Sequence, residues 1–193
     1  PLTVSEPSGE VQDVTNPATG GRIATVMMAD AGTAALGQGE YRLAATDGGE
    51  FTAETLKGQP WAVFFGFTHC PDVCPTTLGD IAGWQEELGD AAKDLRVFFV
   101  TVDPERDSVE TLREYVSWVP GVIGVSGSPE EIAKAVKAFR IYARKSPLAG
   151  GGYNMDHSSM LLLFDRNGEY AGLIGYQEED ARALASLRKL LGS

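Results

Sequence analysis

An unbroken apolar segment at residues 61–67 constrains the fold of this chain more than any other feature of the sequence. It contains only aromatic, aliphatic and glycine residues between Trp61 and Phe67, a composition typical of a strand buried on both faces. Residues 96–102 form a second, largely apolar run, and residues 122–125 form a shorter third one. Strands covered on both faces are characteristic of parallel sheets in α/β proteins. The sequence therefore predicts a central sheet built largely from parallel strands.

Helical patterns separate these predicted strands. Apolar side chains recur at helical spacing between Leu78 and Leu88. Asp107 followed by Glu110 is a capping-box pattern, which predicts a second helix with Asp107 as its cap. A similar pattern at residues 128–131 predicts a third helix. Residues 177–191 begin with acidic residues and have basic residues near their end, as expected for a closing helix.

Short strands joined by tight turns complete the pattern. Residues 160–164 and 170–174 flank a strong hairpin turn, and residues 41–43 and 50–52 flank a weaker one. The predicted order from residue 61 onwards is β-α-β-α-β-α-β-β-α. We therefore expect an α/β protein with a thioredoxin-like fold, in which helices flank a mixed central sheet that has an antiparallel hairpin at one edge.

The first 38 residues differ in composition from the rest of the chain. They are rich in glycine, proline, threonine, alanine and serine, and they contain one apolar run at residues 23–28. This composition predicts that residues 1–38 form an N-terminal extension or linker with one strand. The folded domain is accordingly predicted to occupy residues 39–193.

Charge and hydropathy exclude several classes of partner. The 193 residues carry a net charge of −11, so the chain offers no basic surface to nucleic acid or to anionic lipid. No stretch approaches the about 20 apolar residues that span a bilayer. The chain begins with Pro1, without an initiating methionine or a signal-peptide pattern, and we expect it to be a processed or trimmed product.

Cys70 and Cys74 are the only cysteines in the chain, and they follow the first apolar run. A four-residue spacing at the start of a helix places both sulfur atoms on one face, with Cα atoms about 6 Å apart. This separation suits a disulfide bond, and it also suits two thiolates that share a metal ion. Unpaired backbone N–H groups at the helix N-terminus lower the pKa of a thiol, which favours both uses.

Two features favour metal binding over fast disulfide exchange. Dedicated thiol–disulfide enzymes of this fold carry two residues between their cysteines, whereas this chain has three. Asp72 lies between Cys70 and Cys74, and its negative charge opposes thiolate formation unless a cation is bound. A site with two thiolates needs a third ligand, and histidine is the leading candidate.

The chain has two histidines, His69 and His157. His69 is expected to flank the helix and to face solvent, because it ends the preceding strand. His157 is the favoured third ligand, because in a thioredoxin-like fold the loop before the strand at residues 160–164 approaches the cysteines. Asp156 is a candidate to orient the His157 ring, and Met155 is a candidate thioether ligand. Asp103 is expected to shape a loop near the site.

Three segments carry a resemblance to a known family. Residues 65–76, with both cysteines, resemble the copper-binding motif of the Sco/SenC family of copper-binding assembly proteins. Residues 100–107 resemble the second signature of that family, and residues 153–159 resemble its histidine segment. The likeness extends from about residue 41 to the last helix, in the order of the family and with compatible spacings. Residues 1–38 lie outside it.

The resemblance implies a thioredoxin-like domain that binds one copper ion, Cu(I) or Cu(II), through Cys70, Cys74 and His157. It implies a carrier, not a turnover enzyme, that delivers copper to the binuclear copper site of cytochrome c oxidase or keeps the thiols of that site reduced. A partly exposed coordination sphere is expected, so that a ligand of the acceptor can enter. The alternative is a thiol–disulfide reductase that acts on partner cysteines and binds metal incidentally.

Partners and location also follow from the resemblance. The implied partners are the copper-site subunit of cytochrome c oxidase and another copper chaperone or thiol–disulfide reductant. The family is usually tethered to a membrane by one N-terminal helix, with its domain in the periplasm or an equivalent oxidising compartment. We expect that helix to have been removed from this chain.

Overall fold

Three parallel strands form the centre of a seven-stranded sheet in the computed structural model, which describes residues 10–15, 22–28 and 36–192. They are β5 (Trp61–Gly66), β6 (Arg96–Thr101) and β7 (Val122–Ser126). β5 pairs with β6 and β6 with β7, both in parallel. Every residue of β5 is buried, as its continuous apolar sequence predicts.

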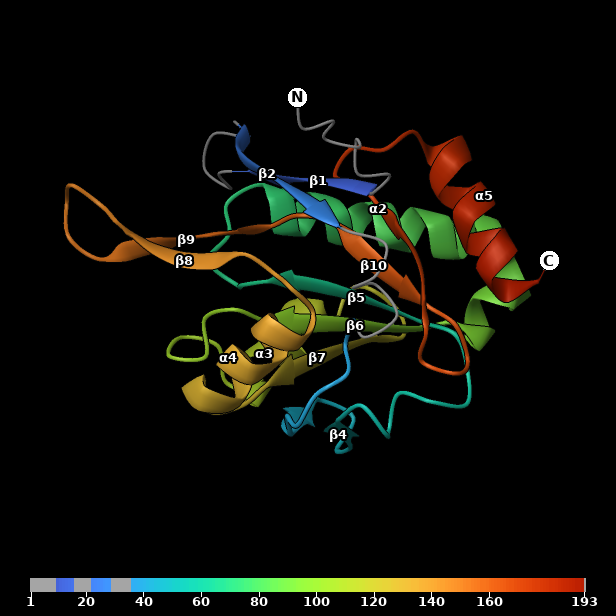
Figure 1. The fold of residues 1–193 in the computed structure, drawn as a ribbon, viewed down its shortest axis with the longest axis horizontal. Helices are drawn as coiled ribbons and strands as arrows, with labels where there is room; N and C mark the ends of the chain where they lie inside the picture. Colours follow the sequence, from blue (N-terminus) through green and yellow to red (C-terminus); the bar gives the residue numbers. More distant parts are fainter. Residues whose placement is uncertain (1–9, 16–21, 29–35, 193) are drawn as a thin grey trace, which may run out of the picture.

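Antiparallel strands extend both edges of this sheet. β10 (Leu161–Phe164) pairs with β5 and with β11 (Tyr170–Ile174), which confirms the hairpin predicted at one edge. At the other edge, β3 (Leu43–Ala45) pairs with β7 and with β4 (Glu50–Phe51). The order is β11-β10-β5-β6-β7-β3-β4, and the middle strands follow one another across the centre of Figure 1. The predicted mixed sheet is confirmed.

One α-helix follows each central strand, and a fourth follows the hairpin of β10 and β11. Their bounds are α2 (Val73–Leu88), α3 (Val109–Val116), α4 (Pro129–Ala138) and α5 (Asp180–Leu191), and a 3-10 helix, η1 (Gly89–Asp94), follows α2. α2 and α5 are in contact, and the indole Nε1–H of Trp84 donates to Asp180 at 2.9 Å. Within the described residues, no helix combines the length and the apolar character that a membrane crossing requires.

The start of α3 differs from the prediction. Ser108 caps this helix, with its side chain accepting from the Thr111 N–H, so Asp107 is not the cap. The Asp107 side chain is fully buried and bonds to other strand ends instead. The prediction for α4 is confirmed, because Ser128 caps that helix and accepts from the Glu131 N–H.

A second, four-stranded sheet has the order β2-β1-β9-β8. It consists of β1 (Glu10–Thr15), β2 (Arg22–Met28), β8 (Ala143–Pro147) and β9 (Tyr153–Ser158). β8 and β9 form a hairpin that projects from the body of the molecule (Figure 1). Residues 153–159 were expected in a loop, so the structure corrects this point: most of the segment is a strand.

The N-terminal extension contains two strands where one was expected. β2 covers the apolar run predicted as a strand, and β1 pairs both with β2 and with the end of β9, where Thr15 is opposite His157. The remaining residues of the predicted extension, apart from 36–38, lie outside the described part of the chain. The boundary at residue 38 therefore stays a prediction.

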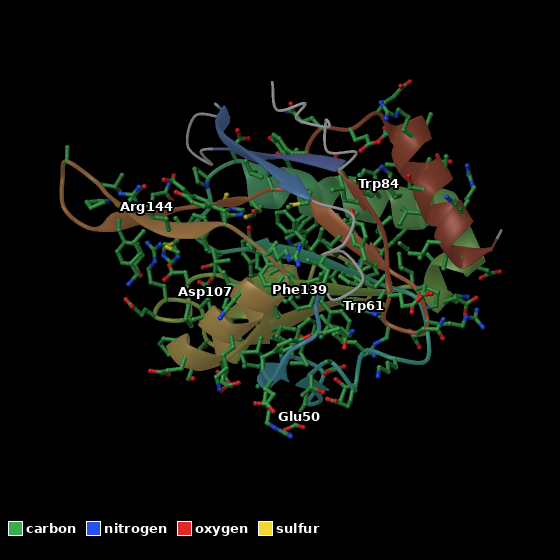
Figure 2. The ribbon with its side chains drawn as sticks, in the orientation of Figure 1. Glu50, Trp61, Trp84, Asp107, Phe139 and Arg144 are labelled. Carbon is green, nitrogen blue, oxygen red and sulfur yellow. The ribbon has the colours of Figure 1, made fainter. Side chains whose placement is uncertain are left out.

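A cluster of aromatic side chains packs together in the core at the central sheet. The Phe139 side chain is fully buried and contacts the rings of Phe51, Trp61 and Phe65. The Trp61 indole stacks on the Phe164 ring with centroids 4.0 Å apart. Figure 2 shows Trp61 and Phe139 inside the molecule. This packing holds the strand that leads into the cysteine segment.

Candidate metal centre

The cysteine segment begins where β5 ends. Cys70 closes a short turn, with its N–H donating to the Phe67 carbonyl at 3.2 Å, and Cys74 lies in the first turn of α2. The Cys74 N–H donates to the Cys70 sulfur at 3.4 Å. Gly66, the last residue of β5, allows this close packing: a Cβ atom there would lie 2.7 Å from the Cys74 sulfur.

His157 reaches the cysteines from β9, in the other sheet. Its ring packs edge-on against the rings of Phe64 and Phe67, with centroids 6.1 and 5.6 Å away. The ring Nδ1 lies 2.7 Å from the Ser158 carbonyl oxygen. Because a carbonyl only accepts, Nδ1 carries the hydrogen, and the lone pair of Nε2 is free to bind a metal. Nε2 lies 3.7 Å from the Cys74 sulfur.

The structure thus brings the three predicted ligands together. The Cys70 sulfur, the Cys74 sulfur and a ring nitrogen of His157 all lie within 4.8 Å of one another, and both cysteines are free thiols. Two sulfur ligands and one imidazole suit a soft transition-metal ion such as copper. The expectation of a partly exposed site is wrong, since the exposed fractions of the three residues are 5%, 0% and 1%.

The two thiols have different acidities. The pKa of Cys70 falls to about 4, chiefly because the Cys74 side chain hydrogen-bonds to it; backbone N–H groups contribute, and burial opposes the shift. Burial raises the pKa of Cys74 well above its ordinary value, and its hydrogen bond to Cys70 adds to this. Cys70 is therefore a thiolate at neutral pH, and Cys74 is the thiol that donates to it.

We predict that the reduced, metal-free protein contains one thiolate at about pH 6, well below the ordinary thiol pKa of about 8.5. Because the pKa of Cys70 is lowered, its charged form persists until the pH falls through about 4. The ultraviolet absorbance of thiolates, followed against pH, measures this directly. Cys70→Ser should remove the acidic step. A single step near the ordinary thiol pKa in the unmodified protein would contradict the prediction.

The other candidates lie elsewhere. His69 is exposed, and its Nδ1 contacts the Thr68 hydroxyl, in keeping with the flanking role expected for it. The Asp156 carboxylate bonds to the Ser146 hydroxyl on β8 and does not orient His157. Neighbouring residues of a strand point to opposite faces, which explains this outcome. Met155 belongs to the buried apolar core.

Asp107 is the residue near the site whose role the sequence did not reveal. Its carboxylate accepts hydrogen bonds from the Thr68 N–H at 3.0 Å, the Thr68 hydroxyl at 2.5 Å and the Thr101 hydroxyl at 2.7 Å. Thr68 is two residues before Cys70, so Asp107 holds the cysteine segment. The sequence contained one indication of this role. Asp107 follows a predicted parallel strand, at the same edge of the sheet as the predicted cysteine segment.

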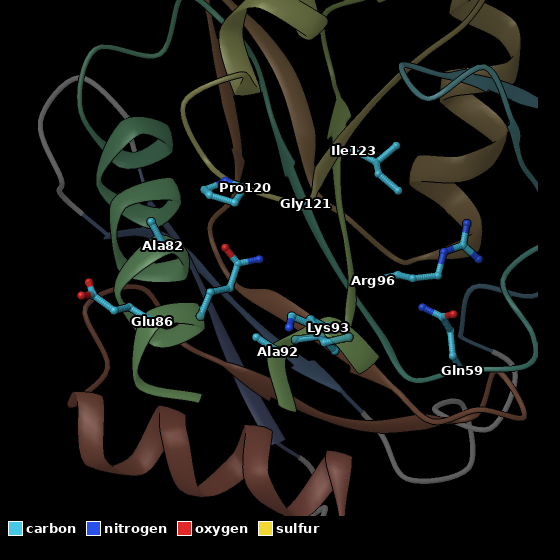
Figure 3. A pocket seen from close by; sticks show the side chains of 11 residues that line it. Gln59, Ala82, Glu86, Ala92, Lys93, Arg96, Pro120, Gly121 and Ile123 are labelled. Atoms are coloured by element: carbon cyan, nitrogen blue, oxygen red, sulfur yellow. The ribbon is translucent and has the colours of Figure 1, made fainter. Parts of the chain in front are cut away.

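A cavity of about 690 Å³ lies away from this centre (Figure 3). Its walls include Ala82 of α2, Ala92 of η1, Arg96 at the start of β6 and Gly121, just before β7. It therefore lies at the N-terminal ends of the parallel strands, whereas the cysteines follow the C-terminal end of β5. None of the side chains that line it belongs to the Cys70, Cys74 and His157 group.

Comparisons with known proteins identify the family of this chain. A family model described as SCO1/SenC matches residues 29–192. The mitochondrial SCO1 homolog 1 of Arabidopsis thaliana is 39% identical over 135 residues, which are 69% of this chain and 40% of that protein. The mitochondrial SCO2 of Saccharomyces cerevisiae is 33% identical over 164 residues, which are 82% of this chain and 54% of that protein. The chain thus spans about half the length of these curated relatives.

Solved structures are similar along most of their length. The structure of Bradyrhizobium japonicum ScoI with copper bound is 39% identical, with a TM-score of 0.74 over 81% of this chain and 99% of that one. The structure of yeast Sco1 with copper bound is 32% identical, with a TM-score of 0.74 over 82% and 90% of the two chains. By its sequence, its fold and the family model that covers most of it, the chain belongs to the SCO1/SenC family.

Proposed function

We propose that this protein is a copper carrier that binds one copper ion through Cys70, Cys74 and His157. The observation that carries the proposal is the convergence of these three ligand atoms within 4.8 Å, with the imidazole tautomer set for binding at Nε2. Two relatives of similar fold, at 39% and 32% identity, are described with copper bound. Copper is here the cargo of the protein.

The ligand set suits a carrier of either oxidation state. Two thiolates satisfy Cu(I), which prefers soft ligands and low coordination numbers. The imidazole adds a nitrogen ligand, which makes the set suitable for Cu(II) as well. Three protein ligands leave the ion open to one more, so a ligand from an acceptor can bind before the carrier releases the ion. The burial of Cys74 and His157 makes Cys70, the most exposed of the three, the natural point of entry.

We further propose that the acceptor is the binuclear copper site of cytochrome c oxidase, and that the partner is the subunit that holds this site. Another copper chaperone or a thiol–disulfide reductant is the proposed donor partner. The proposal places the domain in the periplasm or an equivalent oxidising envelope compartment, tethered to a membrane through an N-terminal helix. It rests on membership of the family and on the motifs at residues 65–76 and 153–159.

An anaerobic copper titration of the fully reduced protein tests the proposal. We expect one equivalent to bind tightly, and the Cu(II) form to show sulfur-to-copper charge transfer in its absorption spectrum with nitrogen coupling in its electron paramagnetic resonance spectrum. Zinc also accepts two thiolates and an imidazole, so a competition titration with zinc is the control for selectivity. Absence of stoichiometric copper binding would overturn the proposal.

A second candidate function is thiol–disulfide reduction, and the lowered pKa of Cys70 favours it. In that reaction the Cys70 thiolate attacks a disulfide of a partner, forms a mixed disulfide and releases one partner thiolate. Cys74 then attacks the Cys70 sulfur, so the partner leaves with two reduced thiols and this chain retains the Cys70–Cys74 disulfide. The contact of the Cys74 N–H with the Cys70 sulfur shows that the two residues are close enough.

A further inference from the structure

The loop at residues 102–107, between β6 and α3, contacts both elements that carry the ligands. Cys70 follows β5 and Cys74 lies in the first turn of α2, whereas His157 belongs to the hairpin of β8 and β9. β5 and β9 lie in different sheets. The relative position of the sulfur and nitrogen ligands therefore depends on what connects the sheets near the site.

On the cysteine side, the contact is made by Asp107. Its buried carboxylate binds the backbone and the hydroxyl of Thr68, as described above. The Ser126 hydroxyl donates to the Asp107 carbonyl at 2.6 Å, which fixes the same residue to the end of β7. A carboxylate that is fully buried and receives three hydrogen bonds holds its donors firmly, because losing any of them leaves a buried charge under-solvated.

On the histidine side, the contact is made by Asp103 and Arg106. The Tyr153 hydroxyl donates to Asp103 at 2.8 Å, and the Arg106 guanidinium forms an ion pair with the same carboxylate. Arg106 also donates to the Tyr153 carbonyl at 3.2 Å, and its guanidinium lies 4.0 Å from the centre of the Tyr153 ring. A further ion pair at 2.5 Å joins Glu105 to Lys145 of β8.

These contacts act on the part of β9 that carries His157. Tyr153 and His157 are four residues apart in one strand, so their side chains point to the same face. A second series of contacts from the loop to His157 passes through Phe67. Arg106 lies 5.8 Å from the centre of the Phe67 ring, and that ring packs edge-on against the His157 ring. Both series of contacts begin in the 102–107 loop.

We propose that the 102–107 loop sets the spacing between the thiolate pair and His157, with Asp107 as the positioning residue for the cysteines and Asp103 with Arg106 as the positioning residues for the histidine. The inference rests on the proposed copper site. The two cysteine ligands and the histidine ligand are then positioned by separate groups of contacts. A substitution can therefore disturb one kind of ligand and leave the other in place.

The test compares Tyr153→Phe with Thr68→Val in the full chain. Tyr153→Phe removes the hydroxyl that binds Asp103 and keeps the ring beneath Arg106. We expect the Cu(II) affinity to fall by about tenfold, the lower end of the range for outer partners of metal ligands, with weaker nitrogen coupling in the spectrum. Its Cu(I) affinity, supplied by the two thiolates, should change little. Thr68→Val should instead weaken Cu(I) binding and leave the nitrogen coupling in place.

Tyr142→Phe is the matched control. Tyr142 precedes β8 at the base of the same hairpin, and in the described part of the chain its hydroxyl has no hydrogen-bond partner. This variant should bind copper as the unmodified protein does. Thermal unfolding of each metal-free variant shows that the fold is retained.

Two results would overturn the inference. One is a Tyr153→Phe protein with unchanged Cu(II) affinity and spectrum. The other is a parallel loss of Cu(I) and Cu(II) affinity in both Tyr153→Phe and Thr68→Val, which would show that the loop contributes only general stability. Failure of the unmodified protein to bind copper would be a different result, because it would reject the proposed function itself.

Discussion

Replacing His157 with alanine is expected to lower the affinity for Cu(II) by more than about a hundredfold, since loss of an outer partner alone costs ten- to a hundredfold. The substitution removes the one nitrogen ligand of the group and leaves both sulfur atoms in place. Competition titration with a chelator of known affinity measures the change. The nitrogen coupling in the Cu(II) electron paramagnetic resonance spectrum should disappear at the same time.

The same variant separates the two candidate functions. Disulfide exchange needs Cys70 and Cys74 alone, so His157→Ala should still reduce a model disulfide. His69→Ala is the matched control, because His69 is exposed and makes its side-chain contact with Thr68. It should leave both copper affinity and exchange unchanged. Equal copper affinity in His157→Ala and His69→Ala would show that His157 is not a ligand.

Replacing Gly66 with alanine is expected to disturb both the fold and the site. The added Cβ would lie 2.7 Å from the Cys74 sulfur and 2.8 Å from the Phe99 ring, and Gly66 is buried at the end of β5, an inner strand of the seven-stranded sheet. Overpacking of a core costs about 1–3 kcal/mol of unfolding free energy. Because the backbone of Gly66 pairs with Thr101 of β6, we expect the strain to be relieved in part by moving Cys74, so copper affinity should fall as well.

Chemical denaturation of the metal-free variants measures the stability change. Gly79→Ala is the control, since Gly79 lies in α2 and a Cβ atom there meets nothing within 4 Å. Alanine is favoured over glycine inside a helix by about 1 kcal/mol, so Gly79→Ala should be as stable as the unmodified protein or more stable. A Gly66→Ala protein with unchanged stability and copper affinity would show that the site tolerates a shift of the Cys74 sulfur.

The central part of the fold follows directly from the sequence. The apolar runs at residues 61–67 and 96–102 predicted buried parallel strands, and β5 and β6 occupy them. Continuous apolar sequences leave few alternatives, because burial on both faces excludes an edge position. The position of the cysteines at the end of the first such strand was predictable for the same reason.

The hairpin of β8 and β9 was not predictable in this way. The sequence of β8 is Ala143 to Pro147 with exposed basic residues, among them Arg144 on the projecting hairpin (Figure 2). Its partner β9 is stabilised by pairing with distant strands, and register between strands is a long-range property. His157 was placed beside the cysteines by the expected fold, although it lies on a strand and not in a loop. Its role as a ligand stays a prediction.

The two aspartates show where local rules fail. Asp107 fits a capping pattern, yet Ser108 caps the helix, because the buried strand ends provide more hydrogen bonds to the carboxylate. Asp156 is next to His157 in sequence, but alternation along β9 directs it to Ser146. In both cases tertiary contacts decide between arrangements that the local sequence permits equally.

The division of the ligands between the cysteine segment and the hairpin of β8 and β9 bears on how fast the proposed cargo can leave. Since Cys74 and His157 are almost inaccessible to solvent and Cys70 is only slightly exposed, we expect an acceptor to reach the ion beside Cys70 once the hairpin and the cysteine segment move apart. That motion is a local opening, which needs neither sheet to unfold. For the proposed carrier we therefore expect the transfer rate to be limited by the frequency of opening once the acceptor is abundant, and to stop rising with acceptor concentration. The time for which the proposed carrier holds its ion would then be fixed by its own structure, and the acceptor would determine only where the ion goes.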